Sequence, residues 1–411
     1  MSLSFESFCD HAAHGRLALV QQMLESGQLL VDGNSHDAIA QAAANGHVDV
    51  VNCLLRYAMF DPSADNSRAI RLAARNGHLA VVERLLQDKR VDPSAEDNCA
   101  VQWAALNGHL AVVERLLQEE HVDPSANDNC AFRWAAENGH VAVVERLLQD
   151  ERVDPSANDN QVVQGAAFYG HLAVVERLLQ DKRVDPSAGD NYAVGWAARN
   201  GHVVVVERLQ QDPRVDPSAN HNFAVKWAAH FGHPAVVDLL LQDMRVDPSV
   251  RENCAVRWAA EYGHLAVVER LLQDERVDPS AEDNDAIRWA AVRGHLAVVE
   301  RLLQDARVDP NRAVRSAAQF GHLAVVERLL QDKRVDPSAK DNLAVRWAAE
   351  SGHVAVVERL LQVECVDPSA DKNCAIQWAA MHGHLAVVER LLQDKRVDPS
   401  ADGQHGSPMR C

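Results

Sequence analysis

The chain has 411 residues and a formal charge of −18, from 41 lysines and arginines against 59 aspartates and glutamates. Nucleic acids and anionic membrane surfaces attract basic proteins, so this balance argues against either as a partner. The first residues lack the basic stretch and unbroken apolar run of a secretory signal, and no apolar run exceeds about five residues, which is too short to cross a bilayer.

The cysteines predict reduced thiols rather than a disulfide framework. Four of the eight share one repeat position: Cys99, Cys130, Cys254 and Cys374. The same position holds Tyr192 and Asp285 in other repeats, and the chain has no CxxC pair of the kind that zinc ribbons use. We therefore expect no metal site and a cytoplasmic location, where thiols stay reduced.

A fixed period runs through the whole chain. Turn glycines recur 31 residues apart, with one shorter gap of 27: Gly15, Gly46, Gly77, Gly108, Gly139, Gly170, Gly201, Gly232, Gly263, Gly294, Gly321, Gly352 and Gly383. A period of this size is typical of solenoids, in which each repeat buries its apolar face against its neighbours. The spacing predicts about 13 stacked repeats.

The first predicted element is an N-terminal capping repeat, residues 1–33. It carries Glu6, Asp10, Gln21 and Gln22, and terminal repeats of solenoids normally have such a polar outer face. Residues 34–402 form the repeat array, and residues 403–411 follow as a C-terminal tail.

The sequence of each internal repeat predicts two helices. In the repeat around Gly108, Asn98 is expected to cap the first helix, and Gly108 to end it in a left-handed conformation. The apolar residues of that first helix are Ala100, Val101, Ala104 and Ala105. Those of the second helix form a wide stripe: Leu110, Val112, Val113, Leu116 and Leu117. The segment "RVDPSAxDN" then contains Asp-Pro, which stops the helix, so an extended loop leads to the next repeat.

Two later repeats depart from this pattern. The repeat after Asp309 reads "VDPNRAV" where its predecessor reads "VDPSAEDNDAI", so we expect a local change of curvature there. The last repeat, "CAIQWAAMHGHLAVVERLLQDKRVDPSADG", is as apolar as an internal one. An uncapped end of this kind could stack on another molecule, the tail could fold back over it, or the chain could be a fragment of a longer gene product.

The motif "AAxNGHLAVVERLL" resembles the second half of an ankyrin repeat, and the resemblance covers almost the whole chain. It implies an all-α, ankyrin-like solenoid of helix-turn-helix repeats. Ankyrin repeats run 33 residues and open with T-P-L-H-x-A, whereas this chain has 31 and reads "CAVQWA". We therefore expect reduced β-hairpin fingers, each replaced by a compact Asp-Pro turn.

The histidines that follow the turn glycines are predicted to be structural. Stacked helices lie about 8–10 Å apart, while zinc holds its nitrogens at about 2 Å, so equivalent histidines cannot share one ion. We expect them to satisfy backbone groups at the turn. All eight tryptophans share one slot, which is expected to face the neighbouring repeat; Gly165 and Ser316 are isolated lapses in that slot.

The variable positions are the candidate binding site. The framework hardly changes between repeats, while the two residues before each turn glycine differ, and the resemblance implies that these positions line a concave groove that grips a partner. The partner-binding candidates are Arg75, Leu106, Glu137, Phe168, Tyr169, Arg199, His230, Phe231, Glu261, Tyr262, Arg293, Phe320 and Met381. Drift of unconstrained surface positions is the alternative, but drift does not favour exposed phenylalanine and tyrosine.

The sequence thus predicts a non-catalytic scaffold that binds protein partners. No G-x-S-x-G, P-loop or H-E-x-x-H motif is present, so we expect no catalytic residue and no cofactor. The partner, or its contact patch, is expected to be basic, to suit an acidic array. The alternative is a structural element that assembles through the uncapped C-terminal repeat.

Overall fold

The computed structural model describes residues 4–26 and 36–398. This part of the chain consists of 26 helices joined by turns and loops, with no strand. The helices form thirteen pairs, one for each turn glycine, which confirms the predicted all-α repeat solenoid with reduced fingers.

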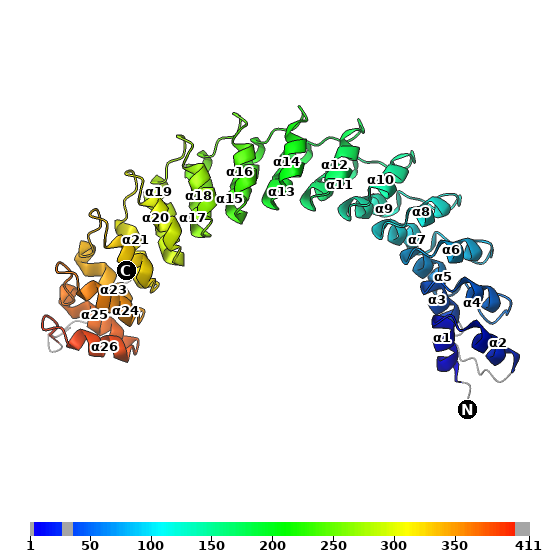
Figure 1. The fold of residues 1–411 in the computed structure, drawn as a ribbon, viewed down its shortest axis with the longest axis horizontal. Coiled ribbons are helices and arrows are strands. Elements are labelled where there is room, and N and C mark those ends of the chain that lie inside the picture. Colours follow the sequence, from blue (N-terminus) through cyan, green and yellow to red (C-terminus); the bar gives the residue numbers. More distant parts are fainter. Residues whose placement is uncertain (1–3, 27–35, 399–411) are drawn as a thin grey trace. The chain divides into compact units, whose positions relative to one another are not determined.

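The first helix of each pair carries an odd number (Figure 1). These helices are α1 (Phe5–Ala13), α3 (His36–Ala44), α5 (Ala64–Arg75), α7 (Ala95–Leu106), α9 (Ala126–Glu137), α11 (Ala157–Phe168), α13 (Ala188–Arg199), α15 (Ala219–Phe231), α17 (Val250–Glu261), α19 (Ala281–Arg293), α21 (Asn311–Gln319), α23 (Ala339–Glu350) and α25 (Ala370–Met381).

The second helix of each pair carries an even number. These helices are α2 (Leu17–Glu25), α4 (Val48–Leu54), α6 (Leu79–Leu86), α8 (Leu110–Leu116), α10 (Val141–Leu148), α12 (Leu172–Leu179), α14 (Val203–Gln210), α16 (Pro234–Leu240), α18 (Leu265–Leu271), α20 (Leu296–Leu302), α22 (Leu323–Leu329), α24 (Val354–Leu361) and α26 (Leu385–Leu392).

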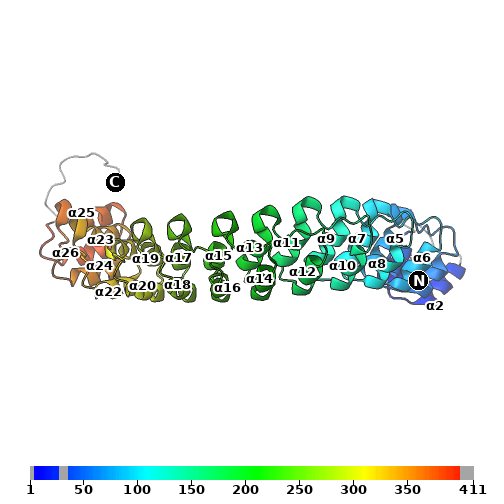
Figure 2. The same ribbon diagram turned by 90° about the horizontal axis from the view of Figure 1, so that it is seen from above.

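The repeats divide into two compact units. The N-terminal unit runs to residue 197 and includes 204–215; the C-terminal unit comprises 198–203 and the residues from 216. Within each unit the pairs follow one another in chain order (Figure 2), odd-numbered helices packing on odd-numbered ones and even-numbered on even-numbered. The predicted division at residues 33 and 402 stays a prediction, and the tail at 403–411 lies outside the described residues.

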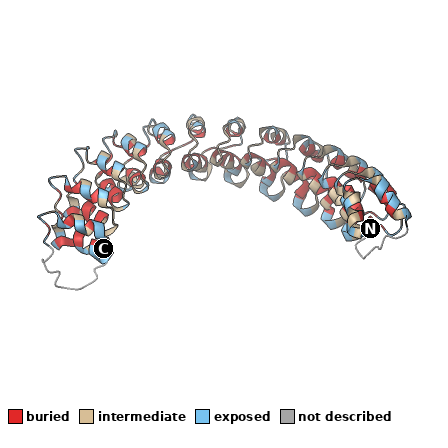
Figure 3. Cartoon of the chain, turned by 60° about the horizontal axis from the view of Figure 1, so that its bottom comes forward, coloured by how far each residue is buried: buried red, intermediate tan, exposed pale blue. Residues whose placement is uncertain are grey.

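The core lies between these two layers of helices (Figure 3). In the repeat of α7 and α8 it consists of two alanines on the first helix and three branched residues on the second, all at most 1% exposed: Ala104, Ala105, Val112, Val113 and Leu116. The small alanines let the second helix approach closely, and each buried leucine or valine contributes about 1.5–3 kcal/mol. Other repeats bury the same positions, so these residues recur in the sequence because they form the core.

Within each unit, the Gly-His turn joins neighbouring repeats. Gly263 ends α17 with φ 79°, and the N–H of His264 donates to the carbonyl oxygen of Ala259 at 2.8 Å, which caps the helix. The ring of His295, from the next repeat, lies over Gly263, and its Nε2 lies 3.0 Å from the carbonyl oxygen of Glu261. The prediction that these histidines satisfy backbone groups is confirmed, and the group belongs to the preceding repeat.

The Asp-Pro loops form a second row of hydrogen bonds. In one loop, the Asp123 carboxylate accepts from the backbone N–H of Ser125 at 2.9 Å and from its hydroxyl at 2.6 Å. In the next, the Arg152 guanidinium holds Asp150 through two bonds and donates to the carbonyl oxygen of Val122 at 2.9 Å. The bonds from Arg152 also hold the pKa of Asp150 below its ordinary value. The motif "DxRVDPS" therefore stabilises a turn within each loop and also connects neighbouring loops by a hydrogen bond.

The predicted cap at Asn98 is wrong. Glu96, Asp97 and Asn98 all have left-handed backbone, with φ between 53° and 67°, and the side-chain oxygen of Asn98 accepts from the backbone N–H of Asp123 at 2.8 Å. Asparagine tolerates this conformation better than most residues. The same left-handed turn stands in every odd-numbered helix from α5 to α25 except α21. The asparagine thus joins its repeat to the next instead of capping its own helix.

Candidate functional site

The candidate binding residues lie together at one end of the odd-numbered helices. Arg75, Leu106, Glu137, Phe168, Arg199, Phe231, Glu261, Arg293 and Met381 are the last residues of their helices, His230 precedes Phe231, and Tyr169, Tyr262 and Phe320 are the C-caps. In most repeats the first residue of each variable pair is half-buried and the second is exposed. We call the surface that the odd-numbered helices present in each unit the odd-helix face.

The tryptophan slot contributes to the same face. As predicted, the tryptophans contact the neighbouring repeat: the guanidinium of Arg75 lies 5.5 Å from the ring centroid of Trp103, and that of Arg346 lies 4.9 Å from Trp378. All eight remain half-buried rather than buried. They are therefore part of the surface as well as of the packing between repeats.

An aromatic cluster lies on the odd-helix face of the C-terminal unit. It consists of Trp227, His230, Phe231, Trp258 and Tyr262. The ring centroids of His230 and Tyr262 are 4.4 Å apart, those of Trp227 and Phe231 are 5.7 Å apart, and those of Trp227 and Trp258 are 5.8 Å apart. Phe231 and Tyr262 are 39% and 45% exposed, and burial lowers the pKa of His230. A preformed aromatic surface of this kind can anchor a partner without ordering new side chains.

The N-terminal unit carries a smaller aromatic group beside a pocket. The ring centroid of Phe168 lies 4.9 Å from that of Tyr169 and 5.9 Å from that of Trp196. With Glu137 and Gly165 these residues line a pocket of ≈ 280 Å³. Burial raises the pKa of the Glu137 carboxyl, while the nearby Arg133 lowers it.

Sequence reasoning missed two pockets on the odd-helix face. Gly165 and Ser316 stand in the tryptophan slot, and each lies in the wall of a pocket. Gly165 lines the one just described, and Ser316 lines one of ≈ 300 Å³ formed by α19, α21 and α23. The signal was present, because these two residues are the breaks in a run of tryptophans. The sequence alone identified them only as isolated lapses in the tryptophan slot.

Two further properties bear on the kind of site. In residues 4–26 and 36–398, no helix combines the length and the apolar character that crossing a membrane requires. In the same residues, no three His, Cys, Asp or Glu side chains gather closely enough to hold a metal ion. The odd-helix face itself carries exposed aromatic and charged side chains, such as Phe231, Tyr262 and Arg75.

Helix pairs that stack through Gly-His turns, with their variable residues on one face, define a helical repeat protein. A family model that describes three consecutive ankyrin repeats matches the chain over residues 8–97, 70–159, 163–252, 227–314 and 314–402. The chain therefore belongs to the ankyrin repeat family, whose repeats are generally protein–protein interaction modules. A search of curated proteins finds no match.

Proposed function

We propose that the protein is a non-catalytic, cytoplasmic scaffold that binds protein partners on its odd-helix face. The observation that carries the proposal is the exposure of Phe231 and Tyr262 within a packed aromatic cluster, since large apolar patches on a monomer mark interaction sites. The charge of −18 favours a partner that is basic overall. Residues 1–33 serve as the capping repeat of the array at 34–402.

Replacing Phe231 and Tyr262 together by alanine is expected to abolish capture of the partner without unfolding the chain. Each aromatic anchor contributes about 2 kcal/mol to binding, which is roughly 30-fold in Kd. The measurement is a pull-down with the full chain, followed by titration of the captured protein. Phe168→Ala with Tyr169→Ala tests the N-terminal unit in the same way.

Met244→Ala is the matched control, because Met244 is the most exposed large apolar residue of the described chain and lies in a loop rather than on the odd-helix face. It should bind like the wild type. Undiminished capture by both aromatic variants, separately and combined, would sink the proposal.

Self-association is a second candidate function, and it rests on the last repeat. Met381 and Leu385 are 72% and 67% exposed. A Cβ built at Gly383 meets no described residue within 4 Å, whereas one built at Gly263, Gly294, Gly321 or Gly352 would lie against a histidine ring of the next repeat. We propose as the alternative that a second copy stacks on α25 and α26. The tail at 403–411, which could fold back over this surface, lies outside the described residues.

Light scattering of the full chain across a concentration series checks this alternative. If α26 is an assembly surface, the mass rises with concentration in the wild type and stays that of one chain in Leu385→Asp, because a buried carboxylate without a partner is costly. A wild type that stays monomeric over the whole series removes the alternative and leaves the odd-helix face.

A further inference from the structure

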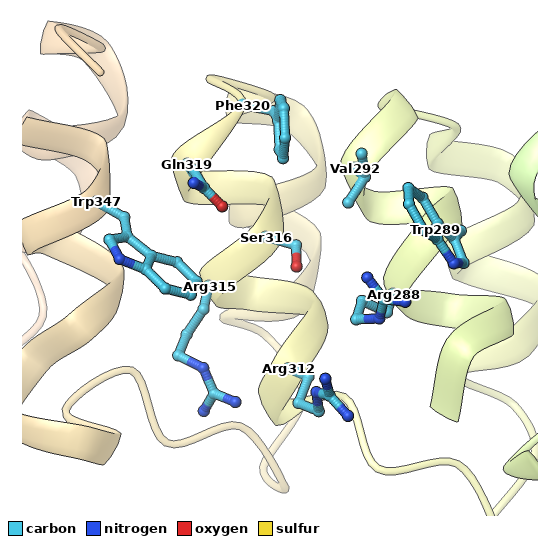
Figure 4. Close-up of a pocket in the computed structure, with 9 residues that line it drawn as sticks. All are labelled: Arg288, Trp289, Val292, Arg312, Arg315, Ser316, Gln319, Phe320 and Trp347. Carbon is cyan, nitrogen blue, oxygen red and sulfur yellow. The ribbon is translucent and has the colours of Figure 1, made fainter. Parts of the chain in front are cut away.

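A pocket in the C-terminal unit arises where the repeat pattern breaks. The repeat of α21 has Ser316 in place of tryptophan, and it is shorter than the others, so α21 starts directly after Pro310 without a left-handed turn. The space that α21 lines together with α19 and α23 is ≈ 300 Å³. In Figure 4, Arg288 extends from α19 toward Ser316, and Arg315 extends beside Trp347. We call this space the arginine pocket.

Three guanidinium groups line the arginine pocket, and one of them has no partner. Arg315 is only 8% exposed, and it makes no hydrogen bond and no ion pair with any residue in 4–26 or 36–398. Its guanidinium remains charged, since arginine does not lose its proton in proteins. Burial and the nearby Arg312 both lower its pKa, and only Asp309, beyond ion-pair distance, raises it. A buried cation left in this way favours any anion that can reach it.

The sequence explains why Arg315 lacks a partner. Four successive repeats carry arginine just before the tryptophan slot: Arg257, Arg288, Arg315 and Arg346. Asp285 pairs with Arg257 at 3.4 Å and with Arg288 at 2.5 Å, and Asp371 pairs with Arg346 at 2.6 Å. At the position of Asp285, the repeat of Arg315 has Arg312 and the following repeat has Leu343.

The pocket is positive although the chain is acidic. Arg312 pairs with the exposed Asp283 at 3.0 Å. The lining includes three arginines and no carboxylate. Asp285 pairs with Arg288 and Asp283 pairs with Arg312, so among the described residues the charge of Arg315 is the one left without an ion pair. Trp289, Phe320 and Trp347 complete the wall with aromatic surface.

We propose that the arginine pocket binds an oxyanion, a carboxylate or a phosphate, on a side chain of the protein partner. The inference rests on the proposed function, because it places one contact of that partner on the odd-helix face. Guanidinium forks match carboxylate and phosphate oxygens in pairs, and the aromatic wall accepts the apolar part of the side chain. The volume is at the small end for ligand pockets, so it suits one side chain. A partner that is basic overall thus presents an acidic group here.

Small probes test the pocket without the partner. The full chain, labelled with ¹⁵N, is titrated with phenyl phosphate, phenylacetate, inorganic phosphate and benzylamine at constant ionic strength, and the indole N–H signals of Trp289 and Trp347 are followed. We expect the aryl anions to shift both signals saturably and benzylamine to shift neither. Tighter binding of phenyl phosphate indicates a phosphorylated side chain, and tighter binding of phenylacetate indicates Asp, Glu or a C-terminal carboxylate.

Three variants sharpen the result. Arg315→Gln should weaken the aryl anion at least tenfold, and Ser316→Trp, which fills the pocket and restores the tryptophan run, should abolish binding. Arg346→Gln is the matched control. Arg346 occupies the same repeat position as Arg315, but it pairs with Asp371 and lies outside the pocket. The variant should therefore bind the aryl anion within about twofold of the wild type. Equal binding by the wild type, Arg315→Gln and Ser316→Trp, or no saturable shift with either aryl anion, overturns the proposal.

The proposed function and the proposal for the arginine pocket can be refuted independently of each other. Phe231→Ala with Tyr262→Ala should leave probe binding unchanged while partner capture is lost. If the aromatic variants still capture the partner, the aromatic residues are not its anchors and the proposed function is refuted. If the wild type nevertheless binds the aryl anions, the proposal for the arginine pocket stands.

Discussion

Gly263→Ala is expected to lower the free energy of unfolding by about 2–5 kcal/mol. The left-handed conformation alone costs a residue with a Cβ about 1–2 kcal/mol, and the new Cβ would lie 2.7 Å from two ring atoms of His295. The ring cannot turn away freely, because its Nε2 is bonded to the carbonyl oxygen of Glu261. Displacing the ring therefore adds overpacking of about 1–3 kcal/mol and frees that carbonyl. The measurement is the midpoint of urea unfolding followed by circular dichroism.

Gly383→Ala is the matched control for this prediction. Gly383 has φ 75°, close to the 79° of Gly263, but a Cβ there meets no described residue within 4 Å. Only the conformational cost of about 1–2 kcal/mol is expected. Equal shifts in the two variants would show that the close approach of the histidine contributes nothing to the stack.

Asn253→Ala is expected to cost about 2–4 kcal/mol through the bond between repeats. Asn253 is buried, has φ 60°, and its side-chain oxygen accepts from the backbone N–H of Asp278 at 2.8 Å. The substitution leaves that N–H unsatisfied, which costs about 1–3 kcal/mol, and it puts alanine in a left-handed turn, which costs about 1 kcal/mol more.

Asn253→Gly separates these two costs. Glycine keeps the left-handed turn but removes the acceptor, so the expected loss is only that of the hydrogen bond, about 1–3 kcal/mol. Both variants are compared with the wild type by urea unfolding. If both stay within about 0.5 kcal/mol of the wild type, the asparagine does not hold the repeats together.

Much of the fold could be predicted because the period of the glycines and the spacing of the apolar residues are local properties of the chain. Asn98 was misread because its bond reaches Asp123, in the next repeat, and no local pattern distinguishes that role from a helix cap. The left-handed turn was missed for a related reason: the conformation is unfavourable alone, and contacts between repeats stabilise it.

The candidate site was predictable in part. The variable positions beside the turn glycines were found by comparing repeats, and the structure places them all at one end of the odd-numbered helices. The arginine pocket could not be found in that way. It requires knowing that Ser316 lies opposite Arg288 and that the acid near Arg315 is too far to pair with it, and both facts depend on contacts between repeats.

The short repeat of α21 shows which part of the repeat can be dispensed with. It has lost the left-handed turn, yet the backbone N–H of Asp309 still donates to the side-chain oxygen of Asn284, and that of Asp336 to the side-chain oxygen of Asn311. Nε2 of His322 still lies 2.8 Å from the carbonyl oxygen of Val292. These three links to the neighbouring repeats therefore survive a deletion in that segment. The left-handed turn is accordingly the natural place to vary repeat length, and foreign peptides could be displayed there between the repeats without unlinking them.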